Sequence, residues 1–174
     1  MKIINIGGAI NAGKSTVSQI LTDKLENAVF IEVDDLLSER EDALLADFDS
    51  RINARLNRLY GLLENYVENG EYGTVVFAYP MSRAAFERTG EIAKGKADFV
   101  VVTLNPPLEK CLTNRGAREL DDWETNRIKE MYRQGVNTFY GSDLIINNDG
   151  ETPEETADRI IAFLGGMAQR GGKV

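Results

Sequence analysis

Short apolar runs alternate along the chain with longer segments that have helical spacing. Five runs are typical of β-strands, at residues 2–6, 28–33, 74–79, 98–104 and 143–147. Their near-continuous apolar character is typical of strands covered on both faces, as in a parallel sheet. Between them, the apolar spacing predicts helices at about 14–26, 50–69, 82–94, 107–115, 123–139 and 153–168. This alternation predicts a three-layer α/β domain with right-handed crossovers.

Particular residues mark the expected ends of these helices. Asp49 or Ser50 is expected to cap the second helix, and Thr152 the last one. Gly70 and Gly165 are expected to stop the second and the last helix, because glycine readily adopts the left-handed conformation at a helix end.

The composition narrows the class of protein. The 174 residues are expected to form a single domain, 1–174, with a frayed tail at about 169–174. A net charge of −8 argues against binding of a nucleic-acid polymer. The chain has no histidine, so any proton transfer must use a carboxylate. The single cysteine, Cys111, has the apolar spacing of a packed helical residue.

No leader, membrane-spanning stretch or lipidation signal is visible in the sequence. We therefore expect a cytoplasmic protein with no membrane partner, present as a monomer or a homodimer.

The segment after the first strand fits the phosphate-binding pattern G-x-x-x-x-G-K-[ST]. Its residues are Gly8, Ala9, Ile10, Asn11, Ala12, Gly13, Lys14, Ser15 and Thr16. Glycines let the backbone curl so that its N–H groups converge on phosphate oxygens, and the following helix adds its positive amino-terminal end. Lys14 is expected to reach the outer phosphates of ATP, and the Ser15 hydroxyl to ligate Mg²⁺.

Two acids close the second strand. Glu32 and Asp34 are two residues apart, so in an extended chain both project to one side. One carboxylate can hold Mg²⁺ through water while the other accepts a proton from a substrate hydroxyl, and phosphoryl transfer needs both. Alternatively, the acids solvate the strand end and cap the next helix.

Further candidates for substrate contact lie on the second helix and after the third strand. Arg51, Arg55 and Arg58 are spaced to share one helix face and are candidates to line a cleft for an anionic or hydroxylated substrate. The alternative is a solvated basic face. Tyr79, at the end of the third strand, is a candidate for substrate contact or for simple packing.

A short charged segment at about 115–122 is predicted to be a lid that brings Arg115 and Arg118 over the transferring phosphate. For Arg127, on the following helix, a surface salt bridge is favoured over a place in the cleft. Asn147 and Asn148 form a turn where a nucleotide base can lie, or an ordinary strand-to-helix turn.

The phosphate loop, Asp34, the run Val100–Leu112, and then Arg115 and Arg118 together resemble the small P-loop kinases. The likeness is to the shikimate kinase, gluconate kinase and chloramphenicol phosphotransferase group, with nucleoside monophosphate kinases as cousins. It implies a five-stranded parallel sheet in the order 2-3-1-4-5 and MgATP as the phosphoryl donor.

The resemblance also implies roles for particular residues. Asp34 would handle the acceptor hydroxyl, while Arg115 and Arg118 would stack on adenine and clamp phosphates. The segment 147–149 would lie beside the adenine, and Glu32 stands where shikimate kinases carry the first acid of an Asp-x-Asp pair. Shikimate kinases place a glycine triplet after the third strand, where this chain reads Ala78-Tyr79-Pro80-Met81, so the acceptor stays open.

The sequence therefore predicts an ATP-dependent kinase that phosphorylates a hydroxyl of a small molecule, with Lys14, Asp34 and Arg118 as catalytic residues. One alternative is a nucleoside monophosphate kinase, in which the arginine row at 51–58 binds a phosphate of the acceptor. A nucleotide-dependent switch or regulator is the alternative from another class, although the chain lacks the Asp-x-x-Gly and Asn-Lys-x-Asp signatures of GTPases.

Overall fold

The molecule is built on one parallel β-sheet, seen here in a computed structural model that describes residues 1–114 and 119–171. The strands stand in the order β2-β3-β1-β4-β5, as predicted. Their bounds are β1 (Lys2–Gly8), β2 (Ala28–Glu32), β3 (Thr74–Ala78), β4 (Asp98–Leu104) and β5 (Leu144–Ile146).

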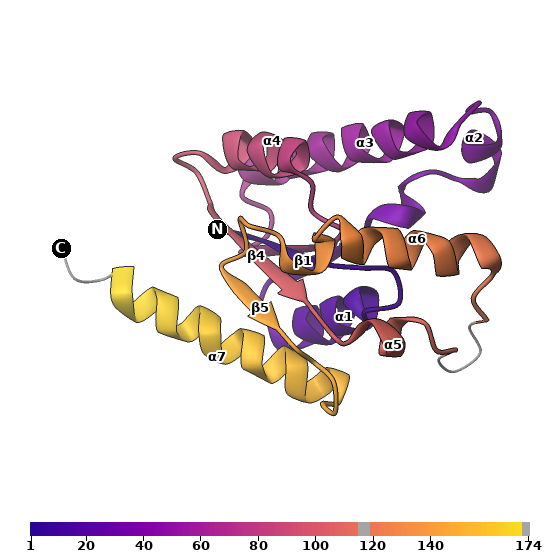
Figure 1. Ribbon diagram of the computed structural model, residues 1–174. Coiled ribbons are helices and arrows are strands. Elements are labelled where there is room, and N and C mark those ends of the chain that lie inside the picture. Colours follow the sequence, from indigo (N-terminus) through magenta and orange to yellow (C-terminus); the bar gives the residue numbers. More distant parts are fainter. Residues whose placement is uncertain (115–118, 172–174) are drawn as a thin grey trace.

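Helices cover both faces of this sheet, which gives the three layers that the sequence predicts (Figure 1). On one face lie α1 (Lys14–Lys24) and α7 (Pro153–Gly171), and on the other lie α3 (Phe48–Asn69) and α4 (Arg83–Ala93). The remaining helices are η1 (Val33–Leu36), α2 (Glu39–Ala43), α5 (Leu108–Cys111), α6 (Asp122–Arg133) and η2 (Val136–Thr138).

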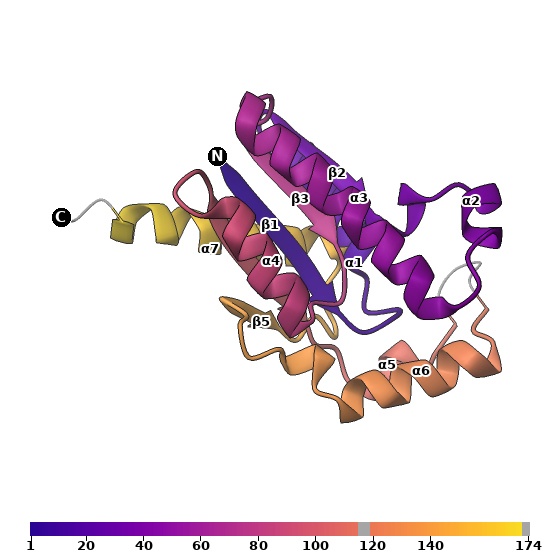
Figure 2. The same ribbon diagram turned by 90° about the horizontal axis from the view of Figure 1, so that it is seen from above.

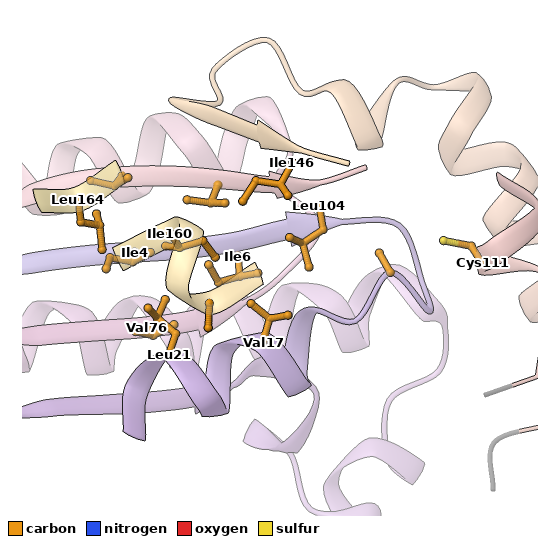
Figure 3. Close-up of a cluster of buried hydrophobic side chains, with 14 of the residues drawn as sticks. Ile4, Ile6, Val17, Leu21, Val76, Leu104, Cys111, Ile146, Ile160 and Leu164 are labelled. Atoms are coloured by element: carbon orange, nitrogen blue, oxygen red, sulfur yellow. The ribbon is translucent and has the colours of Figure 1, made fainter. Parts of the chain in front are cut away.

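Successive side chains of each strand point to opposite faces of the sheet, so the core is divided into two clusters, one on each face. Ile4 and Ile6 of β1 pack in one cluster with side chains of α1 and α7, shown in Figure 3. Ile3, one residue away, belongs to the other cluster, with Leu59 and Leu63 of α3. Each strand of the sheet centre is therefore apolar at consecutive positions, because both of its faces are buried.

Cys111 is fully buried in the first of these clusters, so the expected packing role is confirmed. Among the described residues, no helix is long and apolar enough to cross a membrane.

Helix ends differ from the predictions at several points. Asp47, and not Asp49 or Ser50, caps α3, and its carboxylate accepts from the Ser50 N–H at 2.7 Å. Gly165 does not stop α7, which runs on through Gly171, so residues 169–171 of the expected frayed tail are helical. The caps at Thr152 and Gly70 are confirmed. The rest of the tail, 172–174, lies outside the described residues.

Two further elements depart from the expected pattern. The helix predicted at 107–115 is the single turn α5, and the helix predicted at 123–139 is broken at Gly135, whose φ is 72°. The sequence analysis missed α2, a five-residue helix without an apolar stripe. Its amino-terminal end is nevertheless a complete capping box of Ser38 and Glu41.

Candidate active site

The phosphate loop leaves β1 at the carboxyl edge of the sheet and turns into α1 (Figure 2). Gly8 has a φ of 128°, and a Cβ at this position would lie 2.5 Å from the carbonyl oxygen of Leu104. Gly13 ends the loop at a φ of 95° and stands at the N-cap of α1 without a side-chain cap. The helix therefore begins with its first N–H groups directed to the cleft side of the loop.

Side chains within the loop hold its shape. Ala9 and Ala12 are fully buried and pack beneath the loop, outside the lining of the cleft. The Lys14 ammonium crosses the loop and donates to the Ala9 carbonyl at 2.8 Å. Ser15 and Thr16 are exposed, and both line the cleft. This arrangement matches what the sequence motif requires of a phosphate-binding loop.

Asn11 ties the loop to α5. Its φ of 64° lies in the left-handed region, which asparagine tolerates better than most residues. Its side-chain amide donates to the carbonyls of Cys111 and Thr113, both at 2.9 Å. The loop is therefore joined directly to the segment that leads to residues 115–118.

The turn after β5 lies against the same loop. Asn148 donates from its amide to the Ala12 carbonyl at 3.1 Å, and it lines the cleft. Asn147 is not a lining residue; its side-chain oxygen accepts from the Asp149 N–H at 2.9 Å and shapes the turn. Asp149 pairs with Lys110 at 3.1 Å, and both side chains line this end of the cleft.

Glu32 and Asp34 both line the cleft, but the extended strand ends between them. Glu32 is the last residue of β2, and Asp34 is presented by the short helix η1. Burial raises the pKa of Glu32, and the charges of Asp34 and Asp35 raise it further. A hydrogen bond with the Ser15 side chain and the charge of Lys14 act in the opposite direction. The Glu32 carboxylate therefore lies beside the hydroxyl expected to ligate Mg²⁺.

The arginine row of α3 is held by the segment that precedes this helix. Arg55 lines the cleft, donates to the Asp34 carbonyl at 3.3 Å, and pairs with Asp42 at 2.5 Å. Arg58 is not a lining residue; it donates to the Leu36 carbonyl at 2.5 Å and pairs with Glu41. These arginines fasten η1 and α2 to α3, a role that their spacing alone does not reveal.

Arg51 belongs to the same set of contacts between α2 and α3, which we call the clamp. Its guanidinium lies 3.7 Å from the Asp42 carboxylate and donates to the Leu45 carbonyl at 3.4 Å. Asp42 is thus shared by two arginines of α3, which further fixes α2 in place.

Tyr79 follows β3 and lines the cleft next to Ala78, the residue paired with Glu32 in the sheet. The fully buried Asn5 donates from its amide to the Tyr79 carbonyl at 3.1 Å and so fixes this turn. Burial raises the pKa of the Tyr79 hydroxyl to about 12, with smaller contributions from Tyr60 and Asp34. The phenol therefore stays protonated at neutral pH and can donate a hydrogen bond.

The lining residues among these groups face one cleft of about 1020 Å³. That volume exceeds what a single small ligand needs and suits a nucleotide together with a second small molecule. Lys14, Ser15 and Asn148 line the part around the phosphate loop. The second part of the cleft, called here the second compartment, is lined by side chains from the turn after β3, the start of α3 and helix α6. In Figure 2, α3 and α6 lie on either side of the loop after β1.

Several lining residues in this second part were missed by the sequence analysis. Phe48 and Trp123 contact each other across the cleft, with ring centroids 5.7 Å apart and planes at 60°. Arg127 lines the cleft and also makes its expected salt bridge, to Glu130 at 2.9 Å. The one tryptophan of the chain, directly after the predicted lid, was the available signal.

Arg115 and Arg118, the predicted lid arginines, lie outside the described residues. The end of the predicted lid is not a loop, because Asp121 caps α6 and Asp122 begins it. Among the described residues, no group of three or more acidic, histidine or cysteine side chains forms a metal site. An ion at Ser15 would therefore take most of its ligands from water and phosphate oxygens.

The comparisons with known proteins agree with this geometry, although no family model matches the chain. A shikimate kinase from Sulfurihydrogenibium sp. (strain YO3AOP1) is 29% identical over 166 residues, covering 94% of this chain and 98% of that protein. The chain is thus similar to a shikimate kinase over nearly its whole length, which supports the small P-loop kinase group.

Solved structures of this group share the fold along nearly the whole chain. An unliganded sugar kinase from Janibacter sp. HTCC2649 superposes with a TM-score of 0.68 at 15% identity, covering 95% of each chain. A shikimate kinase from Aquifex aeolicus gives 0.61 at 20% identity, covering 96% of this chain and 98% of its own. These structures confirm the predicted fold class, and together with the curated relative they support the predicted resemblance to small P-loop kinases.

Proposed function

We propose that the protein is an ATP-dependent kinase that transfers the γ-phosphoryl group of ATP to a hydroxyl of a small metabolite. The observation that carries this proposal is that Asp34 lines the same cleft as the phosphate loop and the second compartment. A donor and an acceptor held in one cleft react as if at very high local concentration, which is the main source of catalysis in phosphoryl transfer.

The residues around the phosphate loop are proposed to bind ATP, the phosphoryl donor. The backbone of residues 8–13 and the amino-terminal end of α1 would bind the phosphates, and Lys14 would leave Ala9 for their outer oxygens. The Ser15 hydroxyl beside the Glu32 carboxylate offers the hard oxygen ligands that Mg²⁺ prefers. When bound there, Mg²⁺ would neutralise charge on the phosphates.

Asp34 is proposed as the general base. Its carboxylate would accept the proton of the acceptor hydroxyl as that oxygen forms a bond to the γ-phosphorus. The bond between this phosphorus and the β–γ bridging oxygen breaks in the same step, and ADP leaves. Arg118 is proposed to stabilise the charge on the transferring group, and Arg115 to contact the adenine, as the family resemblance implies. We also propose the cytoplasm, where ATP is available, as the place of action.

The two alternatives are not favoured. A nucleoside monophosphate kinase would use the arginine row to bind an acceptor phosphate, but Arg51, Arg55 and Arg58 are engaged by Asp42 and Glu41. A regulatory protein would not need an acid and space for a second small molecule in the same cleft as the phosphate loop. The name of the 29% identical relative suggests shikimate as one acceptor to test.

The test compares Asp34→Asn with Asp35→Asn, a control in the next residue of η1 that does not line the cleft. ADP release is measured with a small-molecule cell extract as the source of acceptor, and ATP affinity is measured in parallel. We expect Asp34→Asn to lower acceptor-dependent turnover by about 10²–10⁴-fold with little change in ATP affinity. Equal turnover by both variants would exclude Asp34 as the base.

A further inference from the structure

The second compartment of the cleft is lined mainly by apolar and aromatic side chains. Phe48 and Trp123 form its outer pair, and these two residues are 47% and 54% exposed. Further inside, the lining includes Ile52, Met81 and Met131, the last two of which are buried. Exposed aromatic rings at the mouth of a cleft offer flat surfaces for the apolar face of a ring.

The cations of this compartment are already paired. Among its described lining residues, Arg55 and Arg127 are the positively charged side chains. Arg55 pairs with Asp42 at 2.5 Å and is largely buried, with 17% of its side chain exposed. Arg127 pairs with Glu130 at 2.9 Å. Neither guanidinium is therefore an uncommitted partner for an anion.

Negative charge also faces this space. Asp34 and Asp49 line the cleft, on η1 and on the first turn of α3. A carboxylate or phosphate on the acceptor would meet these acids, and it would have to compete with Asp42 for the largely buried Arg55. A neutral alcohol avoids both costs.

We infer that the acceptor is an uncharged alcohol with one apolar face, which packs against Phe48 and Trp123 and presents its hydroxyl to Asp34. This inference rests on the proposed kinase function and specifies its substrate class. It sets the chain apart from the anionic substrate named for its shikimate kinase relative, and it makes the aromatic pair the specificity determinant.

Trp123 is the only tryptophan of the chain, so intrinsic fluorescence reports on this compartment directly. The probes are two matched pairs that differ in charge: methyl shikimate against shikimate, and methyl glucoside against methyl glucuronide. We expect the uncharged member of at least one pair to change the fluorescence with an affinity at least about tenfold higher than its acid, a difference of about 1.4 kcal/mol. Tighter or equal binding of both acids, or no response to either uncharged probe, would overturn the inference.

Substitution of Trp123 tests whether the acceptor packs against this side chain. Trp123→Ala should raise the KM of the acceptor about tenfold with the KM of ATP unchanged, and Trp123→Phe should restore most of the loss. Tyr140→Ala is the matched control, because Tyr140 is 71% exposed and lies outside the cleft. An equal effect of Trp123→Ala and Tyr140→Ala would contradict the assignment.

Asp42→Asn releases Arg55 from its ion pair and should shift selectivity toward the acid of each pair. An unchanged ratio would show that this pairing does not exclude anions. Phosphorylation of shikimate in preference to its ester, lost in Asp34→Asn, would overturn this inference and leave the proposed function intact. Preferential binding of the ester with no phosphoryl transfer to any alcohol would overturn the proposed function, and only the preference of the compartment for uncharged ligands would stand.

Discussion

At the scale of single residues, the phosphate loop depends on glycine at one position for a steric reason. Gly8→Ala would place a Cβ 2.5 Å from the Leu104 carbonyl oxygen, at a φ of 128° that other residues rarely adopt. We expect a loss of about 3 kcal/mol or more in the free energy of unfolding. Gly61→Ala is the control, because Gly61 is a solvent-exposed residue in the middle of α3 with open space for a Cβ. This substitution should raise the free energy of unfolding by about 0.5–1 kcal/mol. Equal effects in denaturant unfolding would contradict this account.

Asn11 combines a left-handed backbone with two side-chain hydrogen bonds, and substitutions separate these contributions. Asn11→Gly keeps the backbone conformation but loses both bonds to the carbonyls of Cys111 and Thr113, worth about 0.5–1.5 kcal/mol each. Asn11→Ala should be less stable still by about 1 kcal/mol, because alanine is strained at this φ of 64°. The unfolding free energies should fall in the order wild type, glycine, alanine. An alanine variant as stable as the glycine variant would exclude backbone strain at this position.

At the scale of elements, apolar spacing located every strand and the long helices, since burial on both sheet faces leaves a strong pattern. It missed α2, which buries no residue and is joined to α3 by ion pairs of Glu41 and Asp42. The capping-box spacing of Ser38 and Glu41 was the signal for it. The partners of Arg55 and Arg58 could not be predicted, because helical spacing shows which residues share a face but not which carboxylates the fold brings to that face.

The clamp between α2 and α3 should make stability depend on acid pH. Hydrogen bonds from Arg58, and then from Ser38, lower the pKa of Glu41 from 4.5 to about 2. Since the folded pKa is below the unfolded one, the contribution is fully present above pH 4.5 and is lost as the pH falls toward 2. Glu41→Gln should therefore flatten the pH dependence of unfolding in that window, while Glu39→Gln on the same helix should not. If the free energy of unfolding of wild type and of Glu41→Gln changed with pH in the same way, this carboxylate would not be linked to folding.

At the scale of the whole molecule, the candidate active site is formed where neighbouring strands end at one edge of the sheet. The parallel order brings the ends of β1, β2 and β3 to one edge, so the phosphate loop, Asp34 and Tyr79 meet although they are far apart in sequence. This convergence was predictable from the strand pattern and the loop motif. The aromatic pair of Phe48 and Trp123 was not, because it depends on how the starts of α3 and α6 approach each other.

The fate of the γ-phosphoryl group tests the central claim most directly. Wild-type protein and Asp34→Asn are each incubated with ATP labelled with ¹⁸O in this group and with a small-molecule extract of the source cells. Mass spectrometry then follows the label. The account predicts that the wild type transfers the label to the hydroxyl of a small, uncharged alcohol, and that Asp34→Asn forms this ester at least about a hundredfold more slowly. Label found only in inorganic phosphate, in equal amounts from both proteins, would contradict it.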